Sequence, residues 1–256
     1  MIQLKVLKQW IQKPLFIPCI LFVCVIAGIV GTLFLTMPVI KTVTATTDPA
    51  SRIIILDAGH GGEDGGTSST DGTKEKDINL AVTLRLKAML ESAGFQVKMT
   101  RETDIAVNDP NLDTVKQRKV SDIKNRLKLI QNTPNCIFIS IHQNHFSESK
   151  YNGTQVFYSK NHEDSKAIAE DIQNQVVTFI QPENKREIKP ATESIYLLWN
   201  TNVPAVLVEC GFLSNSDEES KLKTDNHQQL LVDGIVKGID QYFSDDSSTE
   251  ESNGAT

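Results

Sequence analysis

The sequence predicts an α/β fold, with a mostly parallel central sheet and helices on both of its faces. Short, continuous apolar runs rich in β-branched residues recur along the chain, as in strands that are buried on both sides. Between them lie segments in which apolar residues recur every three or four positions, the period of an amphipathic helix. Alternation of these two patterns favours a parallel sheet between two helical layers. The length of 256 residues suits one sizeable domain behind an N-terminal membrane segment.

The N-terminus has the pattern of an export signal. Residues 1–14 carry lysines and no acid, and residues 15–40 contain no charged side chain. An apolar run of about 20 residues can span a bilayer, and its positively charged flank stays in the cytoplasm. We therefore expect a cytoplasmic basic segment, then a transmembrane signal-anchor or signal peptide, and a linker over residues 41–51. The sequence leaves open whether the apolar segment is cleaved.

The first half of the domain shows two strands and one helix in order. Residues 52–56 form an isoleucine-rich run, which a glycine-rich segment follows. Apolar residues at helical spacing then extend from residue 78 to Gly94, a common stop signal. Residues 95–100 indicate a second strand. The polar loop over residues 101–117 is long enough to predict a functional role.

The second half of the domain repeats the two patterns. Helices are expected where apolar residues keep the helical spacing, and strands where they are continuous. In chain order these are a helix over 120–130, strands over 136–141 and 153–159, a helix over 165–180, a strand over 204–210 and a helix over 231–242. Residues 244–256 are acidic and lack large apolar side chains, which predicts a disordered tail.

Charge and cysteine content narrow the functional classes. The formal net charge is -6 and the isoelectric point is about 5.4, which argues against nucleic acid as a partner. Cys136 and Cys210 lie in apolar, strand-like runs, where an unpaired cysteine behaves as a small hydrophobic residue. A disulfide between them remains an alternative outside the cytoplasm.

Polar side chains gather where the predicted strands end. His60 follows the first strand, His142 and Asn144 follow the run that ends at residue 141, and Glu209 follows an apolar run. The carboxyl ends of parallel strands meet at one edge, so these groups are expected to lie together. Two imidazoles and a carboxylate match the ligands of catalytic zinc, where a metal-activated water attacks an amide. From spacing alone, a structural role for each histidine stays open.

Five ordered motifs resemble those of the zinc-dependent N-acetylmuramoyl-L-alanine amidases. The resemblance covers roughly residues 52–243, nearly the whole expected exported domain. The matching segments are Asp-Ala-Gly-His-Gly-Gly at 57–62, Glu-Lys-Asp-Ile-Asn-Leu at 75–80, Thr-Arg at 100–101, Ser-Ile-His-Gln-Asn at 140–144 and Pro-Ala-Val-Leu-Val-Glu-Cys-Gly-Phe-Leu-Ser-Asn at 204–215. The resemblance implies a domain over this range that has the family's fold and cleaves peptidoglycan.

Carried over residue by residue, the resemblance implies a zinc site and a catalytic carboxylate. His60, Glu75 and His142 would bind Zn²⁺, and Glu209 would be the catalytic residue. The alternative for Glu75 is an ordinary acid near a helix start, stabilised by the helix dipole. Arg126 is a candidate substrate-binding residue or carboxylate partner, with a solvated helix position as the alternative.

Three further positions bear on this interpretation. Asn144, next to the third ligand segment, is a second candidate for substrate binding. Ala58 stands where many family members have proline, which removes no ligand. Cys210 follows Glu209 and is expected to point into the core, because neighbours on a strand face opposite sides. His145 is interpreted as a loop or substrate-side residue, not a ligand.

Within the family, the N-terminal segment and residues 152–158 most resemble the germination-specific amidases of endospore formers. This implies removal of stem peptides from spore cortex peptidoglycan, for muramic-δ-lactam formation and germination. It also implies a polysaccharide deacetylase in the same pathway, an activating partner protein and, as location, the space between forespore and mother cell membranes. The alternatives are a non-catalytic module that binds peptidoglycan or a partner, and a different wall-directed zinc hydrolase.

Overall fold

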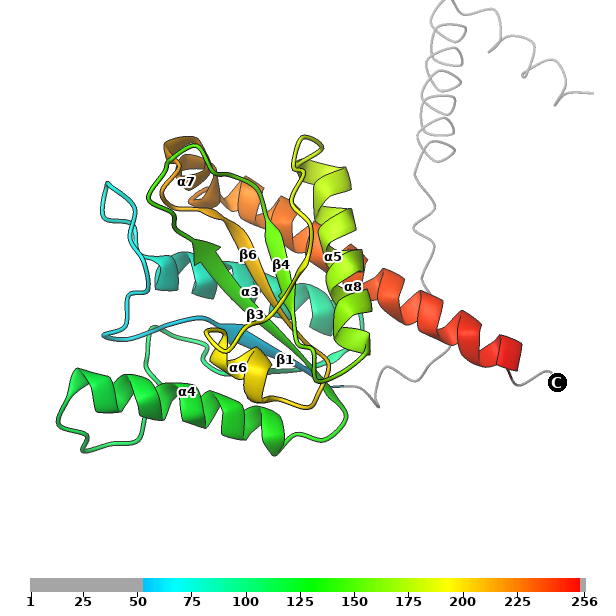
Figure 1. The fold of residues 1–256 in the computed structure, drawn as a ribbon, viewed down its shortest axis with the longest axis horizontal. Helices are drawn as coiled ribbons and strands as arrows, with labels where there is room; N and C mark the ends of the chain where they lie inside the picture. The colour runs from blue at the N-terminus through cyan, green and yellow to red at the C-terminus, as the bar shows by residue number, and fades with distance from the viewer. Residues whose placement is uncertain (1–52, 254–256) are drawn as a thin grey trace, which may run out of the picture. The chain divides into compact units, whose positions relative to one another are not determined.

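The computed structural model describes residues 53–253, which form one α/β domain (Figure 1). The predicted basic segment, apolar segment and linker of residues 1–51 lie outside this range. Among the described residues, no helix is both long and apolar enough to cross a bilayer. The elements are β1 (Ile53–Ala58), α3 (Glu75–Ser92), β2 (Gln96–Met99), α4 (Val115–Gln131), β3 (Cys136–Asn144), β4 (Gln155–Tyr158), α5 (Asp164–Ile180), β5 (Lys189–Pro190), α6 (Tyr196–Asn200), β6 (Ala205–Phe212), α7 (Ser216–Leu222) and α8 (Asp225–Asn253).

The six strands form one sheet in the order β2-β1-β3-β6-β4-β5. Every neighbouring pair is parallel except β4 and β6, which are antiparallel. The expected α/β fold with a mostly parallel sheet is therefore confirmed. The antiparallel strand is a detail that the apolar pattern does not predict, since the pattern reports burial and carries no strand direction.

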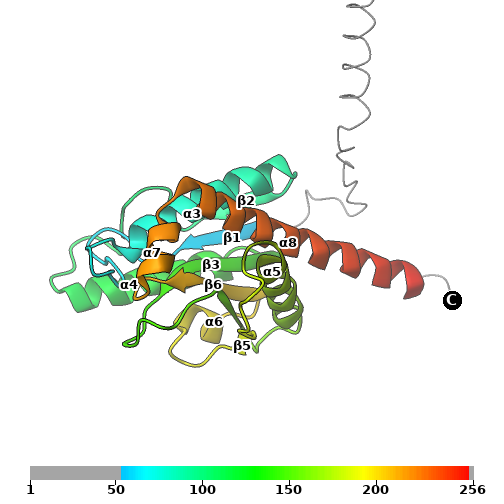
Figure 2. The same cartoon turned by 90° about the horizontal axis from the view of Figure 1, so that it is seen from above.

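Helices cover both faces of the sheet, as expected. One core joins alternate residues of β1, β3 and β6 to α3, α5 and α8, and the other joins the opposite residues to α4 and α6. In Figure 1, α3 passes behind the strands and α6 lies in front of them, and Figure 2 shows the same two helices on opposite sides. Fully burying each aliphatic side chain contributes roughly 1.5–3 kcal/mol, which makes these two layers the main source of stability.

The helix α4, which packs in the second of these cores, has a well-defined start. Thr114 accepts a hydrogen bond from the Gln117 backbone N–H, and the Gln117 side chain accepts one in return from the Thr114 backbone N–H. This capping box satisfies two N–H groups that a helix start otherwise leaves unpaired. It fixes the first turn of α4, next to Arg118 and Lys119, whose side chains contact Glu63 and Asp64 of the glycine-rich segment after β1.

The structure differs from the sequence-based expectations at short elements and at the C-terminus. The elements α6, α7 and β5 are too short to show a period, so the pattern does not predict them. The helix α8 spans Asp225–Asn253, so it extends beyond residue 243, where the expected domain ends. The expected disorder of residues 244–256 stays a prediction. Adding turns to a helix that is already nucleated costs less than starting a new one.

Candidate active site and metal centre

The predicted site residues lie where the chain reverses direction across the sheet. From β1, the chain passes through α3 to β2 on one side, and then through α4 to β3 on the other side of β1. In open α/β sheets, ligands bind outside the carboxyl ends of the strands at such a switch point. His60 follows β1 by two residues, and His142 lies near the end of β3. Glu209 on β6 is the register partner of His142.

Glu75 joins the two histidines into one cluster. It is the first residue of α3, and its Oε2 lies 3.2 Å from Nε2 of His60 while its Oε1 lies 2.9 Å from Nδ1 of His142. One ligand atom from each residue lies within 4.8 Å of the other two. Two imidazole nitrogens and one carboxylate oxygen are the donors of many catalytic zinc sites, so these residues fit the metal that the resemblance implies.

The Glu75 carboxylate is held by three further groups. Its oxygens accept hydrogen bonds from the backbone N–H groups of Thr67 and Gln143, at 2.9 and 3.1 Å, and from the Asn79 side chain at 3.3 Å. Burial alone would raise the pKa of Glu75, but its bonds to the two histidines hold that pKa far below the usual range. The carboxylate is therefore ionised and oriented before any metal binds.

His60 adopts an unusual backbone conformation, and both nitrogens of its ring are in contact with carboxylates. Its φ is 62°, a left-handed value that is uncommon for residues other than glycine. Asp64 Oδ2 contacts Nδ1 at 2.9 Å, which leaves Nε2 facing Glu75. Burial would lower the pKa of His60, but the bonds to Asp64 and Glu75 raise it to about 9. Metal binding must therefore displace a proton from this cluster.

Two glycines make room for the cluster. A Cβ at Gly59 would lie 2.3 Å from Nε2 of His142, and a Cβ at Gly66 would lie 2.5 Å from Oε2 of Glu75. Real Cβ atoms do not approach this closely, and Gly66 also has a φ of +68°. The glycine-rich sequence indicated close approach of the backbone to a ligand. In the structure, the side chains that approach are those of the cluster itself.

Glu209 lies beside the cluster without belonging to it. It is the register partner of His142 on the neighbouring strand, and its Oε2 is buried with no hydrogen-bond partner among the described residues. Burial raises the pKa of Glu209 to about 7. A carboxylate with a pKa near neutrality can both accept and release a proton at physiological pH, as a general base and acid must.

Arg126 is placed differently from the expectation. Its side chain is 2% exposed, so it is neither a solvated helix residue nor able to contact a substrate in solvent. It donates to Asp57 Oδ1 at 2.5 Å and to the backbone oxygens of Ala58 and His60 at 2.9 and 2.8 Å. The substrate contact is thus corrected, whereas the expected carboxylate partner is present as Asp57. Arg126 also holds the backbone that carries His60.

Arg101 has a similar function that the sequence did not reveal. It is buried and donates to the backbone oxygens of Ala58, Gly59 and Lys76, at 2.9, 3.0 and 2.9 Å. It therefore links the loop that carries His60 to the start of the helix that carries Glu75. The Thr-Arg motif could have indicated this role, because an arginine at a strand end can bridge several carbonyl groups.

Asn144, His145 and the two cysteines do not belong to the three-donor cluster. Asn144 is half-buried at the end of β3, and its backbone oxygen accepts a hydrogen bond from Leu213, while His145 is exposed. Cys136 and Cys210 are free, buried thiols, so these two do not form a disulfide with each other. Cys210 is fully buried in the hydrophobic core, as expected, and burial raises its pKa to about 12.

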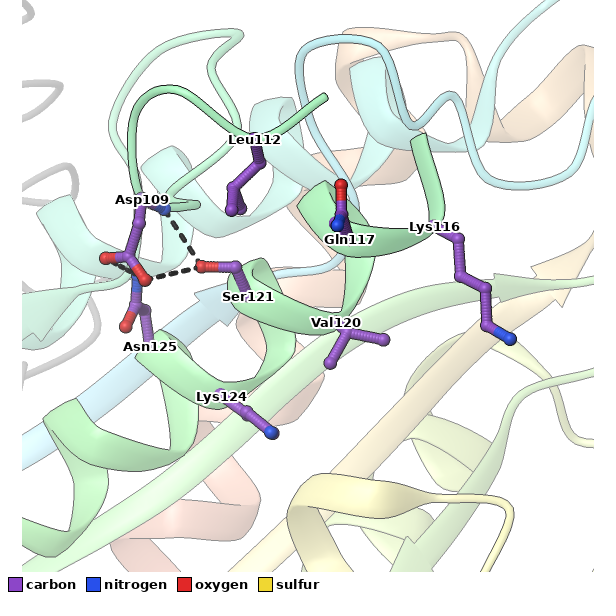
Figure 3. A pocket seen from close by; sticks show the side chains of 8 residues that line it. All are labelled: Asp109, Leu112, Lys116, Gln117, Val120, Ser121, Lys124 and Asn125. Atoms are coloured by element: carbon purple, nitrogen blue, oxygen red, sulfur yellow. Dashed lines mark hydrogen bonds between the residues drawn. The ribbon is translucent and has the colours of Figure 1, made fainter. Parts of the chain in front are cut away.

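The long loop before α4 supports the site and borders a pocket. Asp104 accepts hydrogen bonds from the Gly62 backbone N–H and from the Lys76 ammonium, at 2.8 and 2.6 Å. Asp109, farther along the loop, is bound by Ser121 and Asn125 of α4 (Figure 3). A pocket of about 450 Å³ lies here, but none of the predicted site residues lines it. Its lining consists of Asp109, Leu112, Lys116, Gln117, Val120, Ser121, Lys124 and Asn125.

An α/β sheet with this three-donor cluster and a neighbouring carboxylate of raised pKa has the arrangement of a metal-assisted hydrolase. The chain belongs to the N-acetylmuramoyl-L-alanine amidase family, which it matches over residues 54–241. It is therefore an enzyme of this amidase type. The family match includes all three residues of the cluster as well as Glu209.

Two relatives are particularly informative. The germination-specific N-acetylmuramoyl-L-alanine amidase of Bacillus subtilis is 35% identical over 204 residues, which are 79% of this chain and 84% of that protein. The structure of the CwlD amidase from Clostridioides difficile, in complex with the GerS lipoprotein, is 44% identical with a TM-score of 0.73. That similarity covers 75% of this chain and 98% of the CwlD chain.

A second solved structure supports the same fold. The N-acetylmuramoyl-L-alanine amidase from Clostridium difficile 630 is 29% identical with a TM-score of 0.65, over 76% of this chain and 97% of that one. The described domain therefore corresponds to nearly the whole of both solved amidase chains.

Proposed function

We propose that this chain is a zinc-dependent amidase that hydrolyses the bond between N-acetylmuramic acid and L-alanine in peptidoglycan. The observation that carries the proposal is the cluster of His60, Glu75 and His142 directly beside the buried carboxylate of Glu209. Family membership indicates which bond is cleaved, and the set of two imidazoles and one carboxylate supports zinc as the metal.

The residues divide the chemistry between holding a metal and moving a proton. Zinc, when bound by His60, Glu75 and His142, supplies a Lewis acid that polarises a carbonyl and lowers the pKa of water. Glu209 takes a proton from the attacking water and delivers it to the amine of the leaving L-alanine. One Glu209 oxygen is buried, and the limited solvent around it strengthens the interaction of the carboxylate with charge that develops at the amide.

The two assigned roles can be separated by variants at His60 and Glu209. His60→Ala removes a zinc donor and is expected to lose both bound zinc and hydrolysis. Glu209→Gln keeps the side-chain size and all three donors, so it should retain zinc and lose hydrolysis by at least about 100-fold. Zinc content by elemental analysis and release of stem peptides give the two readouts. Near-wild-type turnover in Glu209→Gln would reject the assigned role of Glu209.

We also propose a role in the spore cortex, with action outside the cytoplasmic membrane. Similarity to the germination-specific B. subtilis amidase supports this role. In the proposed pathway, stem-peptide removal would precede muramic-δ-lactam formation by a deacetylase. Residues 15–40 would hold the domain at the membrane. Deletion of the gene in a spore former should leave cortex peptidoglycan without muramic-δ-lactam, and unchanged lactam content would reject this role.

A partner protein is part of the same proposal. The similar CwlD amidase was solved in complex with the GerS lipoprotein, which supports an extracytoplasmic protein partner for this chain as well. Affinity purification of the tagged chain from sporulating cells is expected to recover such a protein in stoichiometric amount. Recovery of the chain alone would argue against a stable partner.

A further inference from the structure

Arg186 lies on the opposite side of Glu209 from the metal-type cluster, which consists of His60, Glu75 and His142. In the sheet, Glu209 has two register partners, which are His142 on β3 and Gln155 on β4. Directly paired residues of adjacent strands point to the same face, so the three side chains form one row. The Arg186 Nη1 donates to Oε1 of Gln155 at 3.2 Å, which places the guanidinium at the end of this row.

The Arg186 guanidinium is held rigidly but is not neutralised by an ion pair. Its ζ carbon lies 4.4 Å above the centroid of the Phe212 ring and 5.9 Å from that of Tyr151. The Nε donates to the Asn152 backbone oxygen at 2.7 Å. Among the described residues, no carboxylate forms an ion pair with Arg186, and no hydrogen bond is made by its Nη2. A stacked and oriented guanidinium with a free N–H edge is suited to bind a carboxylate.

Glu218 is the acidic group that acts on Arg186 at longer range. Its carboxylate accepts hydrogen bonds from the backbone N–H groups of Gly153 and Phe212, both at 2.8 Å. These bonds use one lone pair on each oxygen and keep the carboxylate directed at the backbone. Among the described residues, Glu218 makes no ion pair with Arg186, so the guanidinium keeps its free N–H edge.

We propose that Arg186 binds the α-carboxylate of the second residue of the stem peptide, D-glutamate. The inference rests on the proposed function, and it adds a residue that selects the substrate. Neighbouring strands lie about 4.8 Å apart, so His142 and Gln155 are separated by roughly 10 Å across the row. An extended peptide spans about 3.5 Å per residue, and the arginine side chain covers the remaining distance.

Two muramyl peptides that differ at one group test this directly. The probes are N-acetylmuramoyl-L-alanyl-D-glutamate and its D-isoglutamine form, in which the α-carboxylate is an amide. Their binding to the zinc-loaded full chain is measured by calorimetry in a Glu209→Gln background, which prevents turnover. The chain is expected to bind the glutamate probe at least tenfold more tightly. Adding Arg186→Gln should abolish that preference, and Arg186→Lys should retain part of it.

Lys185→Gln is the matched control, because Lys185 is an exposed neighbouring cation. It removes the same charge and is expected to keep the tenfold preference. Equal binding of the two probes by the Glu209→Gln chain, or an unchanged preference with Arg186→Gln, would overturn the inference. Thermal unfolding of each variant verifies that it is folded.

Cleavage assays separate this inference from the proposed function. In the chain with Glu209 intact, Arg186→Gln should raise KM for the glutamate probe about tenfold with little change in kcat. Cleavage of neither probe by that chain would argue against the proposed amidase, while the binding comparison would still decide the role of Arg186. Cleavage with an unchanged KM in Arg186→Gln would overturn the role of Arg186 alone.

Discussion

At the scale of single residues, Glu209 and Glu75 show how position gives two carboxyl groups different properties. Glu75 is surrounded by imidazole nitrogens and backbone N–H groups, which stabilise its ionised form. Glu209 is buried without such donors, and one of its oxygens has no partner among the described residues. The first is therefore suited to hold a cation, and the second to exchange a proton.

The raised pKa of Glu209 predicts a pH-dependent stability in the metal-free chain. Between the ordinary pKa of 4.5 and the folded value of about 7, the folded state binds more protons than the unfolded state. The free energy of unfolding should therefore fall as pH rises through this window, by roughly 3 kcal/mol for this group. Urea unfolding of residues 45–256 with a chelator, at pH 4.5 to 8, measures the effect.

Glu209→Gln is the reference for that experiment, because glutamine does not titrate and the other groups are shared. The difference in unfolding free energy between the glutamine variant and the wild type is expected to increase up to about pH 7 and then remain constant. A difference that does not depend on pH would show that Glu209 ionises normally in the folded chain.

The glycines beside the cluster give a second prediction at this scale. Gly59→Ala places a Cβ against the His142 ring, so the ring must move and zinc affinity should fall by at least about tenfold. Gly65→Ala is the matched control, because its nearest contact is Lys74 at 3.5 Å, an ordinary packing distance. Competition with a zinc chelator measures both affinities. Equal affinities would contradict the close packing of His142 on Gly59.

The sequence could predict the cluster but not the groups that hold it. Strand ends locate His60, His142 and Glu209, and the family motif adds Glu75. Arg126 shows the limit of this approach, because helical spacing indicates which face it occupies but not that the face is buried against a polar loop. Its burial depends on Asp57 and on backbone oxygens that are distant in sequence.

At the scale of elements, α4 connects the domain core to the loop that carries His60. Arg118 forms two hydrogen bonds with Glu63, at 2.6 and 2.9 Å, and Lys119 pairs with Asp64 at 2.8 Å. These pairs are partly exposed and contribute little individually. The buried pair of Arg126 and Asp57 lies about two turns farther along the helix and is shielded from water.

Arg126→Met should therefore destabilise the domain strongly. It leaves the Asp57 carboxylate buried beside fewer donors, and loss of one partner from a buried pair costs about 3–5 kcal/mol. Lys128→Met, at an exposed position of the same helix, is expected to change stability by less than about 0.5 kcal/mol. Urea unfolding of both variants measures this. Similar small losses in the two would contradict the structural role of Arg126.

The elements themselves were predictable where a period extends over several turns or a strand is continuously apolar. The helix α7 shows why short elements escape this approach. It contains seven residues, and its start depends on Asn215, whose side chain accepts from the N–H groups of Asp217 and Glu218. Asparagine is also common in turns, so this cap signal alone does not distinguish a helix from a loop.

At the scale of the whole molecule, one sheet edge collects groups from segments that are far apart in the chain. The order β1-β3-β6-β4 places the metal-type cluster, Glu209 and Arg186 in sequence across this edge. The alternation of strands and helices predicted that the carboxyl ends of the parallel strands meet at this edge. The order of strands beyond β6, and therefore the position of Arg186, depends on an antiparallel pairing that carries no signal in the apolar pattern.

The proposed reaction is cleavage of the muramoyl–L-alanine amide by means of zinc and Glu209. It can be measured by mass spectrometry of peptidoglycan treated with the chain, with and without zinc and alongside Glu209→Gln. We expect stem peptides with a free N-terminal L-alanine, formed only with zinc and intact Glu209. Release of acetate or sugar fragments instead, or equal release by Glu209→Gln, would contradict it.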